Sequence, residues 1–278
     1  MHFSSSIVRP PFEARSINLQ VTSGCSHNKC NYCNYYTNVP YKISPKNEIK
    51  EDLIELKNTG YSFKRIWLQG ANPFTLPTEN LKEIAEMIHY YLPFVESIGC
   101  YSRVTDLENK TVDNLQELRR LGYDSIVFGV ESGDNKILNK INKGYKSEQI
   151  VKQISKMDQA QINYTLIYLN SLGGHNYPLC HAKKTAKVFN KLNPKRVMIN
   201  QLKIHDNTPL KKDINEGKFI ETTPKESIKE LITFIESLDI NTFLDATNNT
   251  NIIPFFGQIQ ENKENIIKYL KQYKEEKK

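Results

Sequence analysis

Short apolar runs alternate with segments of helical periodicity as far as residue 202, and this alternation constrains the fold more than any other feature. The apolar runs are rich in β-branched and aromatic residues, which is typical of buried strands. They lie at residues 17–22, 65–69, 97–102, 125–130, 163–169 and 196–202. The helical segments lie at residues 46–58, 78–91, 111–121, 147–159 and 177–192. A repeat of strand, helix and strand requires parallel strands joined by right-handed crossovers, so the sequence predicts an α/β fold with one barrel-like core.

The domain organisation follows from the absence of a glycine-rich, serine-rich or proline-rich linker within this alternation. We expect residues 1–16 to be an N-terminal extension, residues 17–204 to be the barrel core and residues 205–278 to be a C-terminal cap. The cap begins with a loop and is expected to contain a helix at 225–237, a strand at 242–246 and a final helix at 263–273. In a barrel of this type the functional face lies at the carboxyl ends of the strands, so the residues that follow each strand are the candidates for a site.

Hydropathy and charge narrow the possible environments and partners. No apolar run approaches the ~20 residues that a membrane-spanning helix requires, and mean hydropathy is −0.56. The N-terminus lacks the features of a signal peptide, so we expect a cytoplasmic protein with no membrane association. The formal charge of +7 is a modest excess that partly reflects a lysine-rich C-terminus. It does not favour nucleic acid as a partner, and an anionic small molecule or a metabolite carboxylate fits it equally well.

Three of the five cysteines crowd into nine positions directly after the first predicted strand; they are Cys25, Cys30 and Cys33. The odd total and the close spacing favour metal binding by reduced thiolates over disulfide bonds. Three thiolates can hold a four-iron cluster in which one iron has no protein ligand, and a chelating molecule can bind that iron. The alternative is a zinc ion with His27 as the fourth ligand.

Several motifs then add a family resemblance. Tyr32 precedes Cys33, and the stretch GCSHNKCNYC after an N-terminal strand resembles the signature of the radical S-adenosylmethionine (SAM) superfamily. The stretch VESG with Glu131 and Ser132 is similar to that in relatives of oxygen-independent coproporphyrinogen oxidase, and residues 243–266 resemble the tail of the same branch. The resemblance implies a partial (β/α)6 TIM-type barrel with a C-terminal cap. It also implies one oxygen-sensitive [4Fe-4S] cluster on the three clustered cysteines, and SAM as the second cofactor.

The resemblance further implies a function. The reduced cluster would cleave SAM reductively to a 5'-deoxyadenosyl radical, which would abstract hydrogen from an unidentified small-molecule substrate. An electron donor such as a flavodoxin or a ferredoxin is implied as a partner. Two alternatives stay open, namely a radical enzyme that modifies RNA or a peptide, and a non-enzymatic iron–sulfur or zinc protein. Cys100 and Cys180 are too few for a second cluster, which counts against the peptide-modifying alternative.

The same resemblance assigns SAM to residues that directly follow the predicted strands, together with Tyr32 beside the last clustered cysteine. The strand-end residues are Gln69, Gly70, Asn72, Ser102, Arg103, Glu131, Ser132 and Gly173. Arg103 offers a planar fork for the methionine carboxylate, and Glu131 is costly to bury without a partner. The competing roles are a surface charge for Arg103 and a helix cap for Glu131. His175 and Cys180, after the fifth predicted strand, are the candidates for catalysis.

Overall fold

The structure is a computed structural model of the chain, and it describes residues 1–175 and 177–276. Its contacts divide the chain into two compact units. The first comprises Met1–Asn28, Tyr35–Gly129 and Gln153–Tyr164, and the second comprises Lys29–Asn34, Val130–Lys152 and Thr165–Lys278. The chain passes between the units inside β6 (Ile126–Glu131), α5 (Ser147–Ala160) and β7 (Tyr164–Asn170).

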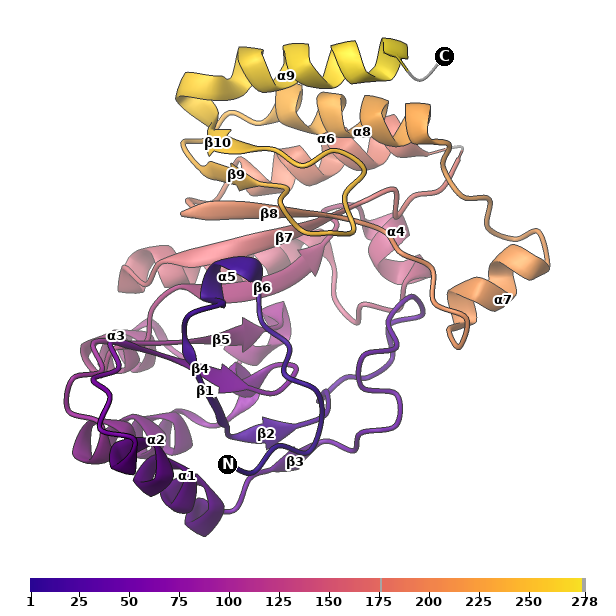
Figure 1. Ribbon diagram of the computed structural model, residues 1–278. Helices are drawn as coiled ribbons and strands as arrows, with labels where there is room; N and C mark the ends of the chain where they lie inside the picture. Colours follow the sequence, from indigo (N-terminus) through magenta and orange to yellow (C-terminus); the bar gives the residue numbers. More distant parts are fainter. Residues whose placement is uncertain (176, 277–278) are drawn as a thin grey trace. The chain divides into compact units, whose positions relative to one another are not determined.

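The first unit is built on parallel strands in the order β1 (Ile17–Gln20), β4 (Arg65–Gln69), β5 (Ser97–Ser102) and β6. Its helices α1 (Lys46–Asn58), α2 (Thr78–Tyr91) and α3 (Val112–Arg120) lie beside one another along this sheet (Figure 1). Short 3₁₀ turns (Pro11–Glu13, Pro73–Thr75, Val104–Leu107) and a ladder of β2 (Thr22–Ser23) with β3 (Lys42–Ile43) complete it. Trp67 of β4 is fully buried and meets the ring of Tyr101 edge-on, with 5.1 Å between centroids. This burial anchors the middle of the sheet.

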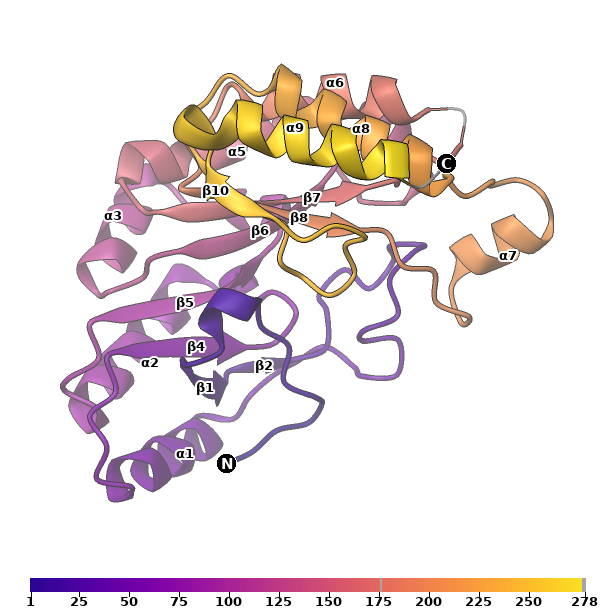
Figure 2. The same ribbon diagram turned by 45° about the horizontal axis from the view of Figure 1, so that its top comes forward.

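The second unit contains β7, β8 (Arg196–Gln201), β9 (Phe243–Asp245) and β10 (Phe256–Gln258). Strand β8 pairs in parallel with β7 and with β9, and β9 pairs antiparallel with β10. Its helices are α4 (Asn135–Lys140), α6 (Pro178–Phe189), α7 (Pro209–Asn215), α8 (Pro224–Ser237) and α9 (Ile259–Glu276). Helix α8 packs against both α6 and α9 (Figures 1 and 2). Tyr168 of β7 stacks on Phe234 of α8 with 3.9 Å between ring centroids, so the helix layer is joined to the sheet by aromatic packing.

The alternation expected from the sequence is confirmed. All six predicted strands and all five predicted helices form, and most ends agree to within a residue or two. The helix expected over 177–192 ends earlier, at Phe189. The loop expected after residue 204 contains α7, because the Thr208 side chain caps the helix by accepting from the Lys211 N–H and Pro209 occupies its first turn.

The C-terminal segment has the helix, the short strand and the final helix that its pattern predicts, and it also has the unexpected strand β10. Strand β9 pairs with β8 and β10 pairs with β9, so the segment extends the sheet of the second unit as well as covering it with helices. The division of the chain at residue 204 stays a prediction. Among the described residues, no helix is both long enough and apolar enough to cross a bilayer.

Candidate cofactor site

The cysteine loop leaves the first unit after β2, and its first thiol belongs to Cys25. The Asn28 N–H donates to the Cys25 Sγ at 3.4 Å, and the Ala71 N–H donates to the Gly24 carbonyl at 3.1 Å. Gly24 has φ +63°, and a Cβ there would lie 2.5 Å from the Val39 carbonyl oxygen. Only glycine fits this position without strain, so the start of the loop is held in one conformation.

Residues 29–34 belong to the second unit and are anchored there on the end of α4. The Asn31 N–H donates to the Ile141 carbonyl at 3.1 Å, and the Asn31 side chain donates to the Lys140 carbonyl at 2.9 Å. Tyr32 packs against a buried apolar cluster of Ile137, Ile141, Leu169 and Leu172. Removal from water raises the pKa of the Tyr32 hydroxyl, and the nearby Glu131 raises it further. Tyr32, expected to contact the cofactor, therefore also fixes the segment that carries the last two cysteines.

The donor set of this loop fits an iron–sulfur cluster. None of Cys25, Cys30 and Cys33 is in a disulfide bond, and all three are partly exposed. The Cys33 N–H donates to the Cys30 carbonyl at 3.3 Å in a tight turn. Thiolates outside disulfide bonds are the usual ligands of such clusters, and an N–H donor on sulfur, as Asn28 is to Cys25, is a typical outer contact. Within the described residues, no three or more His, Cys, Asp or Glu side chains are grouped around a common metal position.

Asp106, which was not predicted from the sequence, forms hydrogen bonds with Asn72, Ser102 and Arg103 in the first unit. The Asn72 side-chain N–H group lies 3.1 and 3.0 Å from the two Asp106 oxygens, and the Arg103 backbone N–H donates to Asp106 at 2.8 Å. Ser102 Oγ lies 3.4 Å from the same carboxylate. Asn72 also holds Ser26, the residue after Cys25, through two hydrogen bonds of 3.2 and 2.7 Å. Three predicted cofactor residues are thus tied to the start of the cysteine loop.

The burial of Asp106 has an electrostatic consequence. Loss of water raises the pKa of the Asp106 carboxyl, while the Arg103 N–H and the Asn72 amide act in the opposite direction. Asp106 could have been found in the sequence as an acid three residues after Arg103. At that position it closes a capping box on the 3₁₀ turn that follows β5. Arg103 Nη1 donates to Thr105 Oγ1 at 3.0 Å, so part of the guanidinium serves this turn as well.

Gln69 and Gly70 make contacts within the first unit. The Gln69 amide donates to Asn18 Oδ1 at 2.6 Å and accepts from the Val8 N–H at 3.2 Å. Gly70 has φ +132°, and a Cβ there would lie 2.0 Å from Thr22 Oγ1. The close approach that a glycine allows at this strand end is therefore made to β2. Their contact with a cofactor stays a prediction.

In the second unit, Glu131 ends β6 with φ +69° and is buried. Lys143, also buried and not foreseen from the sequence, places its Nζ 3.4 Å from the Glu131 Oε1. This is the partner that a buried carboxylate requires. The competing role of Glu131 as a helix cap is wrong, because Asp134 caps α4 by accepting from the Lys136 N–H at 2.9 Å. Ser132 is fully buried, and its hydroxyl accepts from the Asp134 N–H at 3.0 Å.

The segment after β7 carries the remaining predicted residues. A Cβ on Gly173 would lie 3.2 Å from the Tyr177 carbonyl oxygen, which makes the turn tight. His175 is exposed, and its Nδ1 lies 2.7 Å from the Glu226 Oε1. Cys180 lies in the first turn of α6 and is partly exposed. His175 and Cys180 stay candidates, with an acid partner now assigned to His175.

Comparisons with known proteins place this chain in a family. Residues 19–189 match the profile of the radical SAM superfamily. A heme chaperone HemW from Buchnera aphidicola subsp. Acyrthosiphon pisum is 23% identical over 188 residues, which is 65% of this chain and 49% of that protein. The Bacillus subtilis HemW is 20% identical over 77% of this chain and 57% of its own length. The chain thus spans about half the length of these relatives.

A solved structure is similar in fold. The radical SAM methyltransferase TsrM from Kitasatospora setae, with cobalamin and a [4Fe-4S] cluster bound, superposes with a TM-score of 0.59 at 14% identity. The match covers 76% of this chain and 41% of TsrM. Together with the parallel strands and intervening helices, this confirms the α/β class and the partial TIM-type barrel expected from the sequence. The chain belongs to the radical SAM superfamily, whose enzymes use a [4Fe-4S] cluster and SAM.

Proposed function

We propose that this chain cleaves SAM reductively and uses the product radical to remove hydrogen from a small-molecule substrate. The observation that carries the proposal is the set of three closely spaced thiols after β2, none of them in a disulfide bond, inside the segment that matches the superfamily. Cys25, Cys30 and Cys33 would hold the cluster, which when bound supplies the electron that cleaves SAM. A flavodoxin or a ferredoxin would reduce the cluster, and residues 205–278 would cap the core.

The residues of the two strand-end networks would bind and orient the cofactor. Arg103 is positioned by the turn that Asp106 closes, and its guanidinium would meet the SAM carboxylate. Glu131 would accept a hydrogen bond from SAM, while the neighbouring Lys143, 3.4 Å away, compensates its buried charge. Asn72 and Ser102 would add polar contacts, and Gly173 would let the backbone approach the nucleotide.

Iron content tests the proposal. Anaerobically reconstituted protein should carry about four irons per chain. Cys25→Ala, Cys30→Ala and Cys33→Ala should each lose the cluster, whereas Cys100→Ala and Cys180→Ala are matched controls that should keep it. Stoichiometric zinc without iron absorbance after anaerobic purification would contradict the proposal.

The cofactor contacts are tested separately by anaerobic SAM titration, followed through the magnetic resonance spectrum of the reduced cluster. Glu131→Gln should keep the iron and weaken SAM binding by roughly 1.5–3 kcal/mol, because a charge-assisted hydrogen bond is lost. Arg103→Lys should weaken it too, since an ammonium cannot reproduce the guanidinium fork. Unchanged affinity in both variants would assign these residues to the substrate.

A second candidate, heme binding, is favoured by the similarity to two proteins named as heme chaperones. Hemin added to the purified chain should then give a shifted Soret band that saturates at a fixed stoichiometry. A spectrum equal to that of free hemin would reject this candidate while leaving the iron–sulfur test unaffected.

A further inference from the structure

A cavity of about 330 Å³ in the second unit is lined in part by Gly173 and His175, and its basic residues belong to none of the networks described above. Its walls come from α4, from the segment after β7 and from the residues that follow α7. They include Lys136, Lys140, Tyr177, Lys218 and Phe219. The size is at the lower end of pockets that take small organic ligands. Basic and aromatic side chains thus converge on one small space.

The two lysines of α4 give the cavity its charge. The Lys136 Nζ lies 4.6 Å from the centroid of the Tyr177 ring, and the Lys140 Nζ lies 4.7 Å from that of Phe219. Over residues 1–175 and 177–276, neither ammonium has a carboxylate within 4.0 Å. Lys218, by contrast, pairs with Glu216 at 2.5 Å. The aromatic faces hold Lys136 and Lys140 in place without neutralising them.

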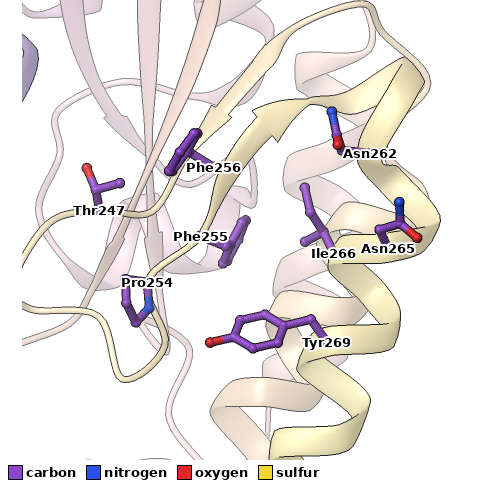
Figure 3. Close-up of a pocket in the computed structure, with 8 residues that line it drawn as sticks. All are labelled: Thr247, Pro254, Phe255, Phe256, Asn262, Asn265, Ile266 and Tyr269. Atoms are coloured by element: carbon purple, nitrogen blue, oxygen red, sulfur yellow. The ribbon is translucent and has the colours of Figure 1, made fainter.

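Another cavity of the second unit differs from this one in charge. The space between the β9–β10 connection and α9, of about 450 Å³, is lined by apolar, aromatic and neutral polar residues. Figure 3 shows Phe255 and Tyr269 facing this space, with Asn262 and Asn265 on the helix. None of its described lining residues carries a charge. It therefore offers no counterpart for an anion.

We propose that the cavity beside α4 binds the oxyanion group, a carboxylate or a phosphate, of an anionic small molecule. Two ammoniums without acid partners attract an oxyanion and repel the sulfonium of SAM, so the charge of the cavity favours an anionic second ligand over the cofactor. The aromatic walls add area for an organic body attached to that group. The prediction that the cavity binds an anion does not depend on the proposed function. The further step of taking this anion to be the substrate does rest on the proposed function.

The test uses the full reconstituted chain and 4-fluorobenzoate, with binding followed by fluorine magnetic resonance. The probe should bind in a saturable manner, and the neutral isostere 4-fluorobenzamide should bind much more weakly. Lys136→Gln combined with Lys140→Gln should weaken probe binding about tenfold or more, because both charge-assisted contacts are lost. Lys183→Gln combined with Lys187→Gln removes two charges from α6, outside the cavity lining, and should bind the probe as the unaltered chain does.

Competition separates the possible ligands. Displacement of the probe by inorganic phosphate would identify a general oxyanion site, and failure of phosphate to compete would assign the site to carboxylates. Displacement by SAM would make the cavity part of the cofactor site and overturn the proposal. Equal probe affinity in the unaltered chain and the Lys136/Lys140 double variant would also overturn it, whereas loss of iron in the cysteine variants bears only on the proposed function.

Discussion

Two buried carboxylates, Asp106 in the first unit and Glu230 in the second, each organise the end of a parallel strand by different means. Asp106 is bound by its near neighbours Ser102 and Arg103 and by Asn72 of the preceding strand end. Glu230 comes from α8, far along the chain, and accepts three hydrogen bonds on a single oxygen, Oε1.

The Glu230 donors are the Tyr168 hydroxyl at 2.7 Å, the His181 Nδ1 at 2.8 Å and the Ser171 N–H at 3.0 Å. Glu230 and His181 are both fully buried. Ser171 has φ +70°, which is unusual for a residue with a side chain, so the hydrogen bond to Glu230 stabilises a strained corner after β7. Helix α8 thereby locks β7 and α6 together.

The comparison shows that a buried carboxylate at a strand end can have two different roles. Asp106 lies among residues predicted to contact SAM, so we expect its loss to affect the cofactor. Glu230 lies beneath the β7 corner and joins a helix to the sheet, so we expect its loss to affect folding first.

The largest expected effect is at Glu230. Glu230→Ala should lower the free energy of unfolding by about 3–5 kcal/mol, because it leaves a buried histidine and a buried tyrosine hydroxyl without their acceptor. Glu230→Gln keeps the volume and one acceptor, so its loss should be smaller and the protein should remain measurable. Glu236→Ala, an exposed position on the same helix, is the control for denaturant unfolding. If folded Glu230→Gln lost as much SAM affinity as Asp106→Asn, the two carboxylates would not differ in their roles as we propose.

An intermediate effect is expected at Asp106. Asp106→Asn should lower the free energy of unfolding by about 1–3 kcal/mol, since the amide cannot accept from all the present donors. It should also weaken SAM binding, because Asn72 and Arg103 lose their common anchor. Anaerobic SAM titration beside urea unfolding measures both, with Asp113→Asn on the exposed face of α3 as the matched control. Lower stability with unchanged SAM affinity would make Asp106 a purely structural residue like Glu230.

A pH dependence of stability is also expected on the Asp106 side. Lys110 is buried, and its Nζ donates to the carbonyls of Leu76 and Asp106 at 2.8 and 3.1 Å. Burial lowers the pKa of Lys110 to about 8 from 10.5, against the opposing charge of Asp106.

Between these two pKa values the unfolded chain binds more protons than the folded one, so stability should rise with pH across this window. The slope contributed by one group is at most about 1.4 kcal/mol per pH unit. Lys110→Met should remove this contribution, which denaturant unfolding of both proteins from pH 7.5 to 10.5 can measure. Parallel pH profiles for the two proteins would contradict the assignment.

The sequence alone determined the order of the elements and the position of the cysteine loop. Strand and helix periodicity are local properties of side chains, and so is the spacing of Cys25, Cys30 and Cys33. For the same reason, the stretch at Glu131 could be singled out at the end of a strand before its surroundings were known. Short elements such as β10 were not predicted, because three residues are too few to show a periodic pattern.

Only the tertiary structure decided which groups meet. Lys143 reaches Glu131 across twelve residues of chain, and Glu230 reaches Ser171 across 59. These partners have no local signal, because a single lysine or glutamate in a sequence is typical of a solvated charge, and only packing shows that its water has been removed. Burial then makes each unpaired polar group costly, so the fold that aligns the strand ends also selects the hydrogen-bond partners there.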